Sequence, residues 1–279
     1  MPATPPKPES ASITRAEYDQ EDALSFTGLK ELLKSPAHYQ HWRTSIKEET
    51  KALIIGAATH SAVLTPDLFK DAYAMAPECD RRTKEGKAVW EAAQAALKPG
   101  QRVLSFDDYK HVMDIADAVV AVWSTPIANP NGWAETPLFG KDRETPIKGI
   151  PDYIDSDGWI YDLKTTSDGI DERSALRTIL NYKYHVQAAH YIRLAQCHRS
   201  DILGHRIVFV EKDAPHGVAI YEIAGEVLKA GRDECERAYS LYDQCRAESN
   251  WPTVLQRQGV VTLDTLPGSK AAKGVTVSF

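Results

Sequence analysis

The stretch IKGIPDYIDSDGWIYDLKT, residues 147–165, decides how the centre of this chain folds. Two apolar runs flank a short polar turn, which is the pattern of a β-hairpin. The first run contains Pro151-Asp152, and the second closes on Asp162, Leu163 and Lys164. Two carboxylates and an ammonium group at the edge of a hairpin can hold a hard divalent cation and activate water against a phosphodiester.

The turn decides whether the two aspartates share a face. A loop of Ser156, Asp157 and Gly158 places the glycine where a positive φ is needed. With that loop, Asp152 lies opposite Asp162, with Cβ atoms about 5 Å apart. A two-residue loop would put the aspartates on opposite faces, so a shared site requires the three-residue loop.

Lys164 is two residues beyond Asp162 and shares its face, while Tyr161 and Leu163 point into the core. The Asp/Glu-x-Lys pattern has little specificity, because it also occurs in polar, helix-like surroundings at Glu49-Thr50-Lys51, Glu85-Gly86-Lys87 and Asp108-Tyr109-Lys110. The hairpin alone is equally consistent with an ordinary hairpin that has exposed polar ends.

A histidine in an apolar segment is the first supporting feature. Gly56 and His60 are one turn apart on a predicted buried helix, and small residues there would let the helix approach the sheet. His60 could then ligate a metal ion. A histidine satisfied within the core is the alternative, and taken alone it is the commoner case.

Three more polar residues could belong to the same site. Glu135 lies on the predicted strand before the hairpin and could bind a second metal ion or orient a water; a strand-edge charge is the alternative. Gln187 and Tyr191 share a helix face and could hydrogen-bond across the site or contact the scissile strand. A plain amphipathic helix explains that pair nearly as well.

Composition favours one globular domain. The 279 residues are 43% hydrophobic and contain no internal linker. We expect a disordered N-terminal tail over residues 1–15, a single domain over 16–255 and a flexible C-terminal tail over 256–279. The sequence has no signal-peptide pattern and no apolar run of about 18 residues, so we expect a cytoplasmic protein without a membrane partner.

Charge and cysteine usage narrow the function classes. The net charge of −6 argues against a protein that simply coats duplex DNA, although a nuclease can confine positive charge to a channel. The cysteines lack zinc or iron–sulfur spacing, so we expect reduced thiols and no iron–sulfur cluster; they are Cys79, Cys197, Cys235 and Cys245.

The order of predicted elements indicates an α/β sheet core with an added helical layer. We predict helices over residues 28–34, 36–44, 52–64, 82–97, 106–122, 174–197 and 226–248. We predict strands over residues 134–139, 147–154, 159–165, 206–211 and 218–223.

The motifs GxxxH, a glutamate strand, GIPD, DLK and QxxxY occur here in that order. This order resembles the RecB-like branch of the PD-(D/E)XK nucleases, and within it the RecE-type (exonuclease VIII) nuclease domains. LSFTGLKELLKSPAHY, DRRTKEGK, YDLKTT and NYKYHVQAAHY carry the likeness over about residues 20–250. It implies a restriction-endonuclease-like α/β core, with a mixed central sheet flanked by helices and added N-terminal and C-terminal helices.

Two features depart from that pattern. The first strand offers two acids, Asp152 and Asp155, and we choose Asp152 because it follows Ile-Pro. The scattered cysteines differ from the iron–sulfur nucleases of the same branch.

The resemblance implies a catalytic set of Asp152, Asp162, Lys164, Glu135, Gln187 and Tyr191. It also implies one or two Mg²⁺ or Mn²⁺ ions, held by His60, Asp152, Asp162 and the Leu163 carbonyl, with Glu135 at a second ion. Without metal the two aspartates would repel each other, and one would tend to stay protonated.

The resemblance implies a 5′-to-3′ exonuclease that acts on double-stranded DNA ends and leaves 3′ overhangs for recombination by strand annealing. It further implies a ring-shaped homo-oligomer, a tetramer, from a bacterium or phage, with a RecT-like annealing protein as partner. Ser25 and Thr27 at a helix N-terminus could receive a 5′-phosphate. A basic cluster could contact the duplex, and consists of Arg81, Arg82, Lys84 and Lys87.

The sequence is also compatible with several alternatives. Ser25 and Thr27 could simply cap a helix, and the basic cluster could be a solvated helix face. An endonuclease or a helicase-associated nuclease could share the core, as could a non-catalytic DNA-binding module. A glycosidase with paired carboxylates fits poorly, because it has no need of the adjacent lysine.

Overall fold

The computed structural model describes residues 7–45, 49–124 and 131–253. Residues 1–6 and the whole predicted C-terminal tail, 256–279, lie outside the described residues. Within the predicted N-terminal tail, Glu9–Ser12 form the short 3₁₀ helix η1, and the Ser10 hydroxyl donates a hydrogen bond to the Pro137 carbonyl at 2.6 Å.

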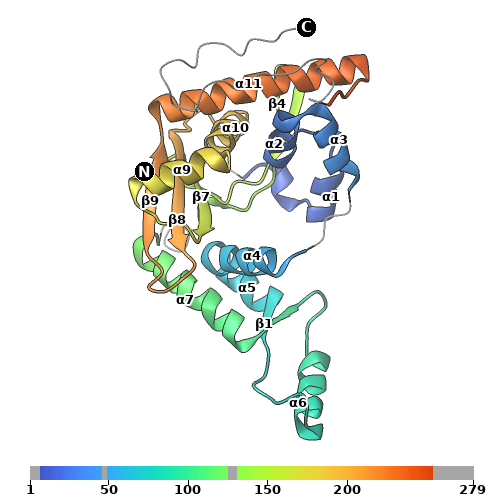
Figure 1. Cartoon of the computed structure of the whole chain (residues 1–279), viewed down its shortest axis with the longest axis vertical. Coiled ribbons are helices and arrows are strands. Elements are labelled where there is room, and N and C mark those ends of the chain that lie inside the picture. Colours follow the sequence, from blue (N-terminus) through green and yellow to red (C-terminus); the bar gives the residue numbers. More distant parts are fainter. Residues whose placement is uncertain (1–6, 46–48, 125–130, 254–279) are drawn as a thin grey trace, which may run out of the picture.

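A five-stranded mixed sheet forms the centre of the molecule (Figure 1). Its spatial order is β3 (Trp133–Ala134), β6 (Tyr153–Ile154), β7 (Trp159–Thr166), β8 (Gly204–Glu211) and β9 (Val218–Ile223). Strands β7 and β8 pair in parallel, and the other neighbours pair antiparallel. The parallel pair needs a crossover, which contains α9 (Glu172–Asn181) and α10 (Tyr184–Gln196). Strand β7, which carries Asp162 and Lys164, is therefore the middle strand.

Helices cover both faces of this sheet (Figure 1). One core cluster joins the sheet to α10 and the flanking helices α2 (Phe26–Lys34), α3 (Pro36–Thr44) and α11 (Gly225–Glu248). The opposite cluster joins it to α4 (Lys51–Leu64), α5 (Pro66–Ala72) and α7 (Phe106–Val122). Tyr161 and Leu163 belong to this second cluster and Ile160 to the first, as strand alternation requires.

Two smaller units extend from this core. Strands β1 (Tyr73–Met75) and β2 (Arg102–Leu104) pair in parallel and carry α6 (Lys84–Ala95), which projects from one end of the molecule as an arm (Figure 1). Strands β4 (Leu138–Asp142) and β5 (Thr145–Gly149) form a hairpin against α10, and α1 (Arg15–Gln20) precedes α2. None of the described helices is both long enough and apolar enough to cross a membrane.

The predicted hairpin is confirmed. Tyr153 pairs with Tyr161 and Ile154 with Ile160, which is the register of the three-residue loop. Gly158 has φ +97°, and a Cβ there would lie 2.1 Å from the Asp201 carbonyl oxygen. Arg199 clamps the turn by donating hydrogen bonds to the carbonyls of Asp155 and Ser156 at 2.8 and 2.9 Å.

Three predicted elements are wrong because each is two elements. The strand over residues 134–139 is β3 and β4, which are separated by Glu135 in a left-handed conformation (φ +42°) and by Pro137, which has no N–H to donate. The strand over 147–154 is β5 and β6, and the gap contains Pro151. The helix over 174–197 breaks between α9 and α10, where Lys183 has φ +64°.

The remaining predicted helices and strands are confirmed to within a few residues, as is the α/β fold class with its mixed sheet. Our explanation of Gly56 is wrong, because a Cβ at this position would meet nothing within 4 Å. A close approach that needs glycine occurs between two other helices. At Gly231 on α11, a Cβ would lie 2.1 Å from the His185 carbonyl oxygen of α10.

These two glycines give a matched test of packing. We expect Gly231→Ala to lower the free energy of unfolding by about 2 kcal/mol or more, because α10 and α11 would have to separate. Gly56→Ala should raise it by about 0.5–1 kcal/mol, because alanine is the better helix former and has room. Urea unfolding of both variants measures the difference. A stabilised Gly231→Ala variant would contradict the close contact.

A buried histidine predicts acid sensitivity. The His190 ring accepts a hydrogen bond from the Tyr239 hydroxyl at 2.8 Å and donates one to the Lys148 carbonyl at 3.0 Å. Burial lowers the pKa of His190 to about 4, although the bond to Lys148 opposes this shift. The unfolded chain therefore binds more protons below its own pKa of about 6.5, and the histidine's contribution to stability is lost as pH falls from there toward 4.

We expect His190→Gln to be less stable than the wild type at pH 7 but less sensitive to acid. Between pH 7 and pH 5 the wild type should lose about 2 kcal/mol more than the variant. Urea unfolding at the two pH values measures this difference. Equal losses in the two proteins would show that His190 titrates normally in the fold.

Candidate active site

The first acid of the hairpin is tied directly to its second strand. Asp152 lies one residue before β6, and its Oδ2 accepts a hydrogen bond from the Leu163 backbone N–H at 2.7 Å. The same oxygen lies 3.4 Å from Nδ1 of His60, which α4 brings to the sheet. Asp152, the Asp162–Lys164 segment and His60 therefore meet at one place.

The second acid is buried in the middle of the sheet. Asp162 is 1% exposed, and its Oδ1 accepts a hydrogen bond from Nε2 of Gln187 on α10 at 2.8 Å. Its Oδ2 forms an ion pair with the Lys164 ammonium group. That ammonium also lies 4.9 Å from the ring centroid of Tyr184. Strand β7 and helix α10 thus fix this carboxylate from two sides.

The alternative acid, Asp155, occupies a different place. Its Oδ1 accepts hydrogen bonds from the backbone N–H groups of Asp157 and Trp159 at 3.0 and 2.8 Å. Asp155 is therefore engaged in closing the hairpin turn, whereas Asp152 faces His60.

An unusual backbone conformation places Glu135 beside Asp152. Its left-handed φ of +42° is unfavourable for a residue with a side chain. Its N–H donates to the Asp152 carbonyl at 2.9 Å, and its carboxylate accepts a long hydrogen bond from Thr65 at 3.5 Å. The chain therefore holds Glu135 next to Asp152 at the expense of local strain.

The three carboxylates differ in their affinity for protons. Burial raises the pKa of Asp162 to about 6 against the opposing charge of Lys164, and repulsion from Asp152 adds to the rise. Burial also raises the pKa of Glu135, again with a contribution from Asp152. Burial would raise the pKa of Asp152 too, but His60 and then Lys164 lower it below its usual value. The shifts show that these groups interact as one charge cluster.

Both basic groups bind their protons more tightly in this arrangement than they would in water. Burial alone would lower the pKa of Lys164, but Asp162 and Asp152 raise it above its usual value. Burial likewise opposes protonation of His60, and Asp152 reverses the effect, so its pKa is raised. Lys164 can therefore supply a positive charge here, and it is a poor general base.

The donor types suit a hard divalent cation, because carboxylate oxygens and an imidazole nitrogen converge. Across the described parts of the chain, no three His, Cys, Asp or Glu side chains are placed to ligate one ion as they stand. Lys164 pairs with Asp162, and His60 lies against Asp152. The buried Oδ2 of Asp162 makes no hydrogen bond of good geometry, so it could accept a cation if the lysine moved. The residues therefore fit a metal ion that Asp152, Asp162 and the neutral ring of His60 would hold, and that would add to the positive charge of Lys164.

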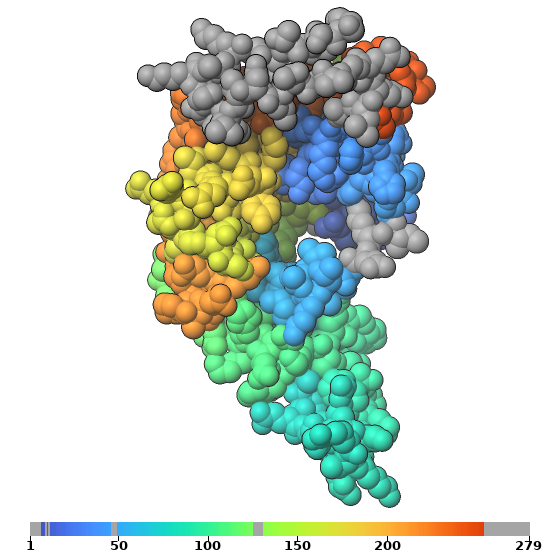
Figure 2. All heavy atoms as spheres, in the orientation of Figure 1, coloured from blue at the N-terminus to red at the C-terminus, as the bar shows by residue number. Residues whose placement is uncertain are grey.

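A cleft of about 840 Å³ opens beside this cluster, between the N-terminal helices and α10. Figure 2 shows the hollow between the blue N-terminal segment and the yellow α9–α10 segment. Of the predicted site residues, the cleft is lined by Ser25, Thr27, Lys164, Gln187 and Tyr191. Ser25 is the N-cap of α2, and its hydroxyl accepts the Gly28 N–H at 3.2 Å. The structure thus brings the helix N-terminus to the same cleft as Lys164.

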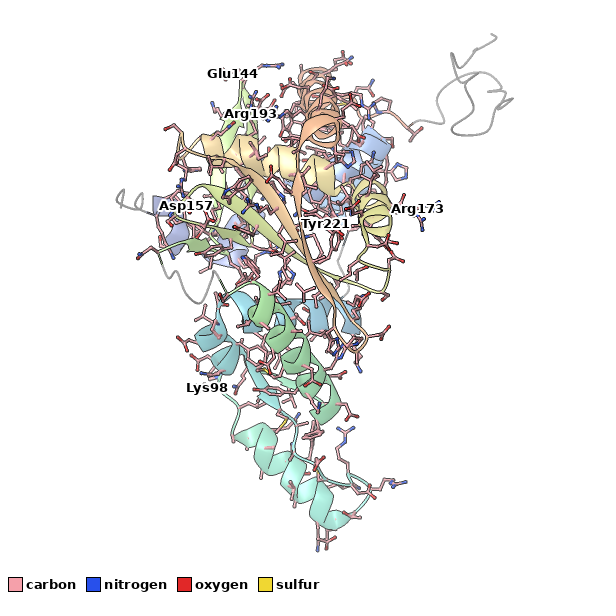
Figure 3. The ribbon with its side chains drawn as sticks, turned by 90° about the vertical axis from the view of Figure 1, so that its left-hand side faces the viewer. Lys98, Glu144, Asp157, Arg173, Arg193 and Tyr221 are labelled. Atoms are coloured by element: carbon pink, nitrogen blue, oxygen red, sulfur yellow. The ribbon has the colours of Figure 1, made fainter. Side chains whose placement is uncertain are left out.

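The predicted basic cluster lies elsewhere, on the arm around the start of α6. In Figure 3, Lys98 marks the arm and Asp157 the hairpin turn, and the two lie far apart. Arg82 pairs with Asp80 at 2.9 Å, and Arg81 lies over the Trp90 ring at 4.6 Å. This cluster is therefore not part of the cleft.

Lys148 and Tyr184 also line the cleft, although neither is a predicted site residue. Lys148 is 7% exposed, and its ammonium donates to the carbonyls of Tyr18 and Glu21, both at 2.7 Å. Tyr184 lies under Lys164. The sequence did contain a signal for each residue. Lys148 is a lysine within an apolar run, and Tyr184 lies about one helical turn before Gln187.

Several solved structures are similar to this chain, and two of them are exonucleases by description. A candidate exonuclease from Eubacterium rectale matches with a TM-score of 0.61 and 15% identity, over 88% of this chain and 91% of that one. At this identity the match shows a shared fold. A phage-related exonuclease from Haemophilus somnus 129PT matches with a TM-score of 0.35 and 16% identity, over 80% and 95% of the two chains, which is too weak to support an argument.

A search of curated proteins finds no significant match. A family model described as a PDDEXK-like domain of unknown function, DUF3799, matches residues 25–257. This match spans most of the chain and includes both strands of the β6–β7 hairpin. The chain therefore belongs to the DUF3799 family of PDDEXK-like domains.

Proposed function

We propose that this protein is a metal-dependent deoxyribonuclease that digests double-stranded DNA from its ends in the 5′-to-3′ direction and leaves 3′ overhangs. The observation that carries the proposal is the meeting of Asp152, Asp162 and Lys164 across the β6–β7 hairpin, with Lys164 lining a cleft. The match to a PDDEXK-like family supports the reaction class. The direction of digestion comes from the likeness to RecE-type sequences.

Mg²⁺ or Mn²⁺, one or two ions, would be held by His60, Asp152, Asp162 and the Leu163 carbonyl, with Glu135 at the second ion. When bound, it supplies the Lewis acidity that activates water and neutralises the phosphate. These are the ligand types that such ions prefer.

The chain's own residues provide orientation and charge. Lys164 keeps its proton beside the aspartates, so its role is to stabilise negative charge that builds up on the phosphate or to position the attacking water. Gln187 fixes Oδ1 of Asp162 through a hydrogen bond of 2.8 Å. Burial raises the pKa of Tyr191 well above its usual value, so its hydroxyl stays protonated and can donate a hydrogen bond to the scissile strand.

Recognition of an end would take place at the start of α2. Ser25 and Thr27 line the cleft together with Lys148 and Lys164. Unpaired backbone N–H groups at a helix N-terminus attract phosphate. A 5′-phosphate bound there would lie in the same cleft as the catalytic cluster, which would favour cleavage close to the end.

Assembly and partners belong to the same proposal and rest on the RecE-type likeness alone. We propose a homo-oligomeric ring, a tetramer, that encircles duplex DNA and cooperates with a RecT-like annealing protein. The basic cluster on the arm would contact the duplex at a distance from the cleft.

End-labelled DNA tests this proposal. With Mg²⁺ or Mn²⁺, linear duplex labelled at its 5′ end should release the label early, and 3′-labelled duplex should release it late. Lys164→Ala should lose about 100-fold or more of this activity, because one preorganised charge at the reacting phosphate is removed. Removing the metal with EDTA should abolish digestion.

Lys141→Ala is the matched control, because Lys141 is an exposed lysine whose ion pair with Glu144 is long, at 3.7 Å. It should digest like the wild type. DNA binding with Ca²⁺ and thermal unfolding should be nearly unchanged in both variants. Full activity of Lys164→Ala would remove the catalytic assignment, and cleavage of closed circular duplex would favour an endonuclease.

Metal binding should also be visible without any DNA. Mn²⁺ at about 100 times its dissociation constant should raise the free energy of unfolding of the wild type by about 2.7 kcal/mol. Asp162→Asn should lose this gain because it lacks a charged ligand. Asp114→Asn, which alters an exposed carboxylate on α7, should keep it. An equal gain in all three proteins would show that the ion binds somewhere else.

A further inference from the structure

Two tyrosines form a continuous path from the catalytic cluster to the surface. The rings of Tyr182 and Tyr184 are stacked, with centroids 5.7 Å apart and planes at 18°. Tyr184 lines the cleft and lies 4.9 Å beneath the Lys164 ammonium. Tyr182, the other ring of the stacked pair, is 53% exposed. An aromatic surface therefore begins at Lys164 and ends in solvent.

The turn between α9 and α10 determines where the rings of Tyr182 and Tyr184 lie. Lys183 adopts a left-handed conformation (φ +64°), which is strained for a lysine. Its ammonium is anchored to Glu234 at 2.7 Å, and its carbonyl accepts the N–H groups of Val186 and Gln187, both at 3.0 Å. One anchored turn thus places Tyr182, Tyr184 and Gln187 together, and that links the exposed ring to the catalytic cluster.

A second cavity of about 280 Å³ adjoins Tyr182, lined by Lys30, Leu33, Lys34, Asn181, Tyr182 and Lys183. Like the active cleft, it lies between α2 and the segment around the α9–α10 turn. Lys34 pairs with Glu31 at 2.7 Å, so it and Lys183 are partly neutralised. Lys30 forms no ion pair among the described residues and lies over the Phe26 ring at 5.9 Å. The cavity therefore combines an exposed ring with one available cation.

We propose that Tyr182 is a stacking platform for an unpaired nucleotide of single-stranded DNA, next to the nucleotide that is cleaved. This inference rests on the proposed nuclease function and specifies which part of the substrate the site holds. A terminal base pair must open before one strand can reach the buried Asp162, and the freed base exposes a ring face. An exposed aromatic side chain can cover that face whatever the sequence, and Lys30 can contact the adjoining phosphate.

Binding of a labelled single-stranded oligonucleotide, followed by fluorescence anisotropy with Ca²⁺ in place of Mg²⁺, tests this directly. Tyr182→Ala should weaken binding about ten-fold, the loss expected when one base loses its stacking partner. Tyr182→Phe and Tyr182→Trp should bind like the wild type, because they keep a ring face. Phe106→Ala is the control, since Phe106 is an exposed aromatic residue at the start of α7, where the arm joins.

Salt dependence separates stacking from charge. Tyr182→Ala should leave the slope of log Kd against log salt unchanged, because stacking releases no counterions. Lys30→Ala should reduce the slope by about 0.7, the value for one phosphate contact on a single strand. The proposal is overturned if Tyr182→Ala binds like the wild type, or if Tyr182→Phe binds as weakly as Tyr182→Ala.

Thermal unfolding checks that the variants fold. If Tyr182→Ala does not fold, Tyr182→Leu replaces it, because leucine keeps the apolar bulk but has no ring face. If the wild type digests DNA while Tyr182→Ala binds and digests equally well, the stacking proposal fails and the nuclease proposal stands. If no metal supports digestion but binding still depends on Tyr182, the platform stands and the nuclease proposal fails. Absence of both binding and digestion in the wild type overturns both.

Discussion

The hydrogen bond from the Leu163 N–H to Asp152, across the β6–β7 hairpin, is the contact on which the candidate site depends. It brings the carboxylate of the first strand to the backbone that connects Asp162 to Lys164. Concentrating carboxylates in a mostly buried place is unfavourable unless counter-charges and donors accompany them. Lys164 supplies a positive charge to Asp162, His60 lies against Asp152, and Gln187 donates a hydrogen bond to Asp162. The same balance leaves Asp162 with a raised pKa, because burial and repulsion from Asp152 outweigh the stabilising charge of Lys164.

Much of the surrounding structure keeps this hairpin in register. Gly158 allows the turn to pass close to the Asp201 carbonyl, and Arg199 holds the turn by its carbonyl groups. Strand β7 is paired on both sides, and its alternate residues enter the two main core clusters. A slip of one residue would exchange these faces and bury the charged side in apolar surroundings. Packing and charge therefore select the same register.

Local chemistry made some of these features predictable from sequence. The position of Gly158 and the two-residue period of a strand leave one register in which Asp152 and Asp162 can meet, and that register is observed. Helix α7 was predictable because Ser105 precedes a long run of helical periodicity as its N-cap. Features held by distant residues were not predictable. The break at Lys183 is anchored by Glu234, 51 residues away, and Lys148 is held by the Tyr18 carbonyl, 130 residues away. The sequence shows that basic residues are concentrated around the start of α6, but only the fold shows that this segment is an arm away from the cleft.

Net charge is a poor guide to this protein's proposed substrate, because electrostatics act locally. At physiological ionic strength the Debye length is about 8 Å, so most carboxylates on the outer surface are screened from a strand in the cleft. Within the cleft, the side chains nearest the proposed path of DNA include Lys148 and Lys164, with Lys30 at the adjoining cavity. Asp19, the carboxylate that lines the cleft, pairs with Arg15 at 3.1 Å, and the carboxylates of the catalytic cluster would be neutralised in part by a divalent ion. A chain with a charge of −6 can therefore present a positive path to a phosphate backbone, and the metal ion would be part of what makes that path positive.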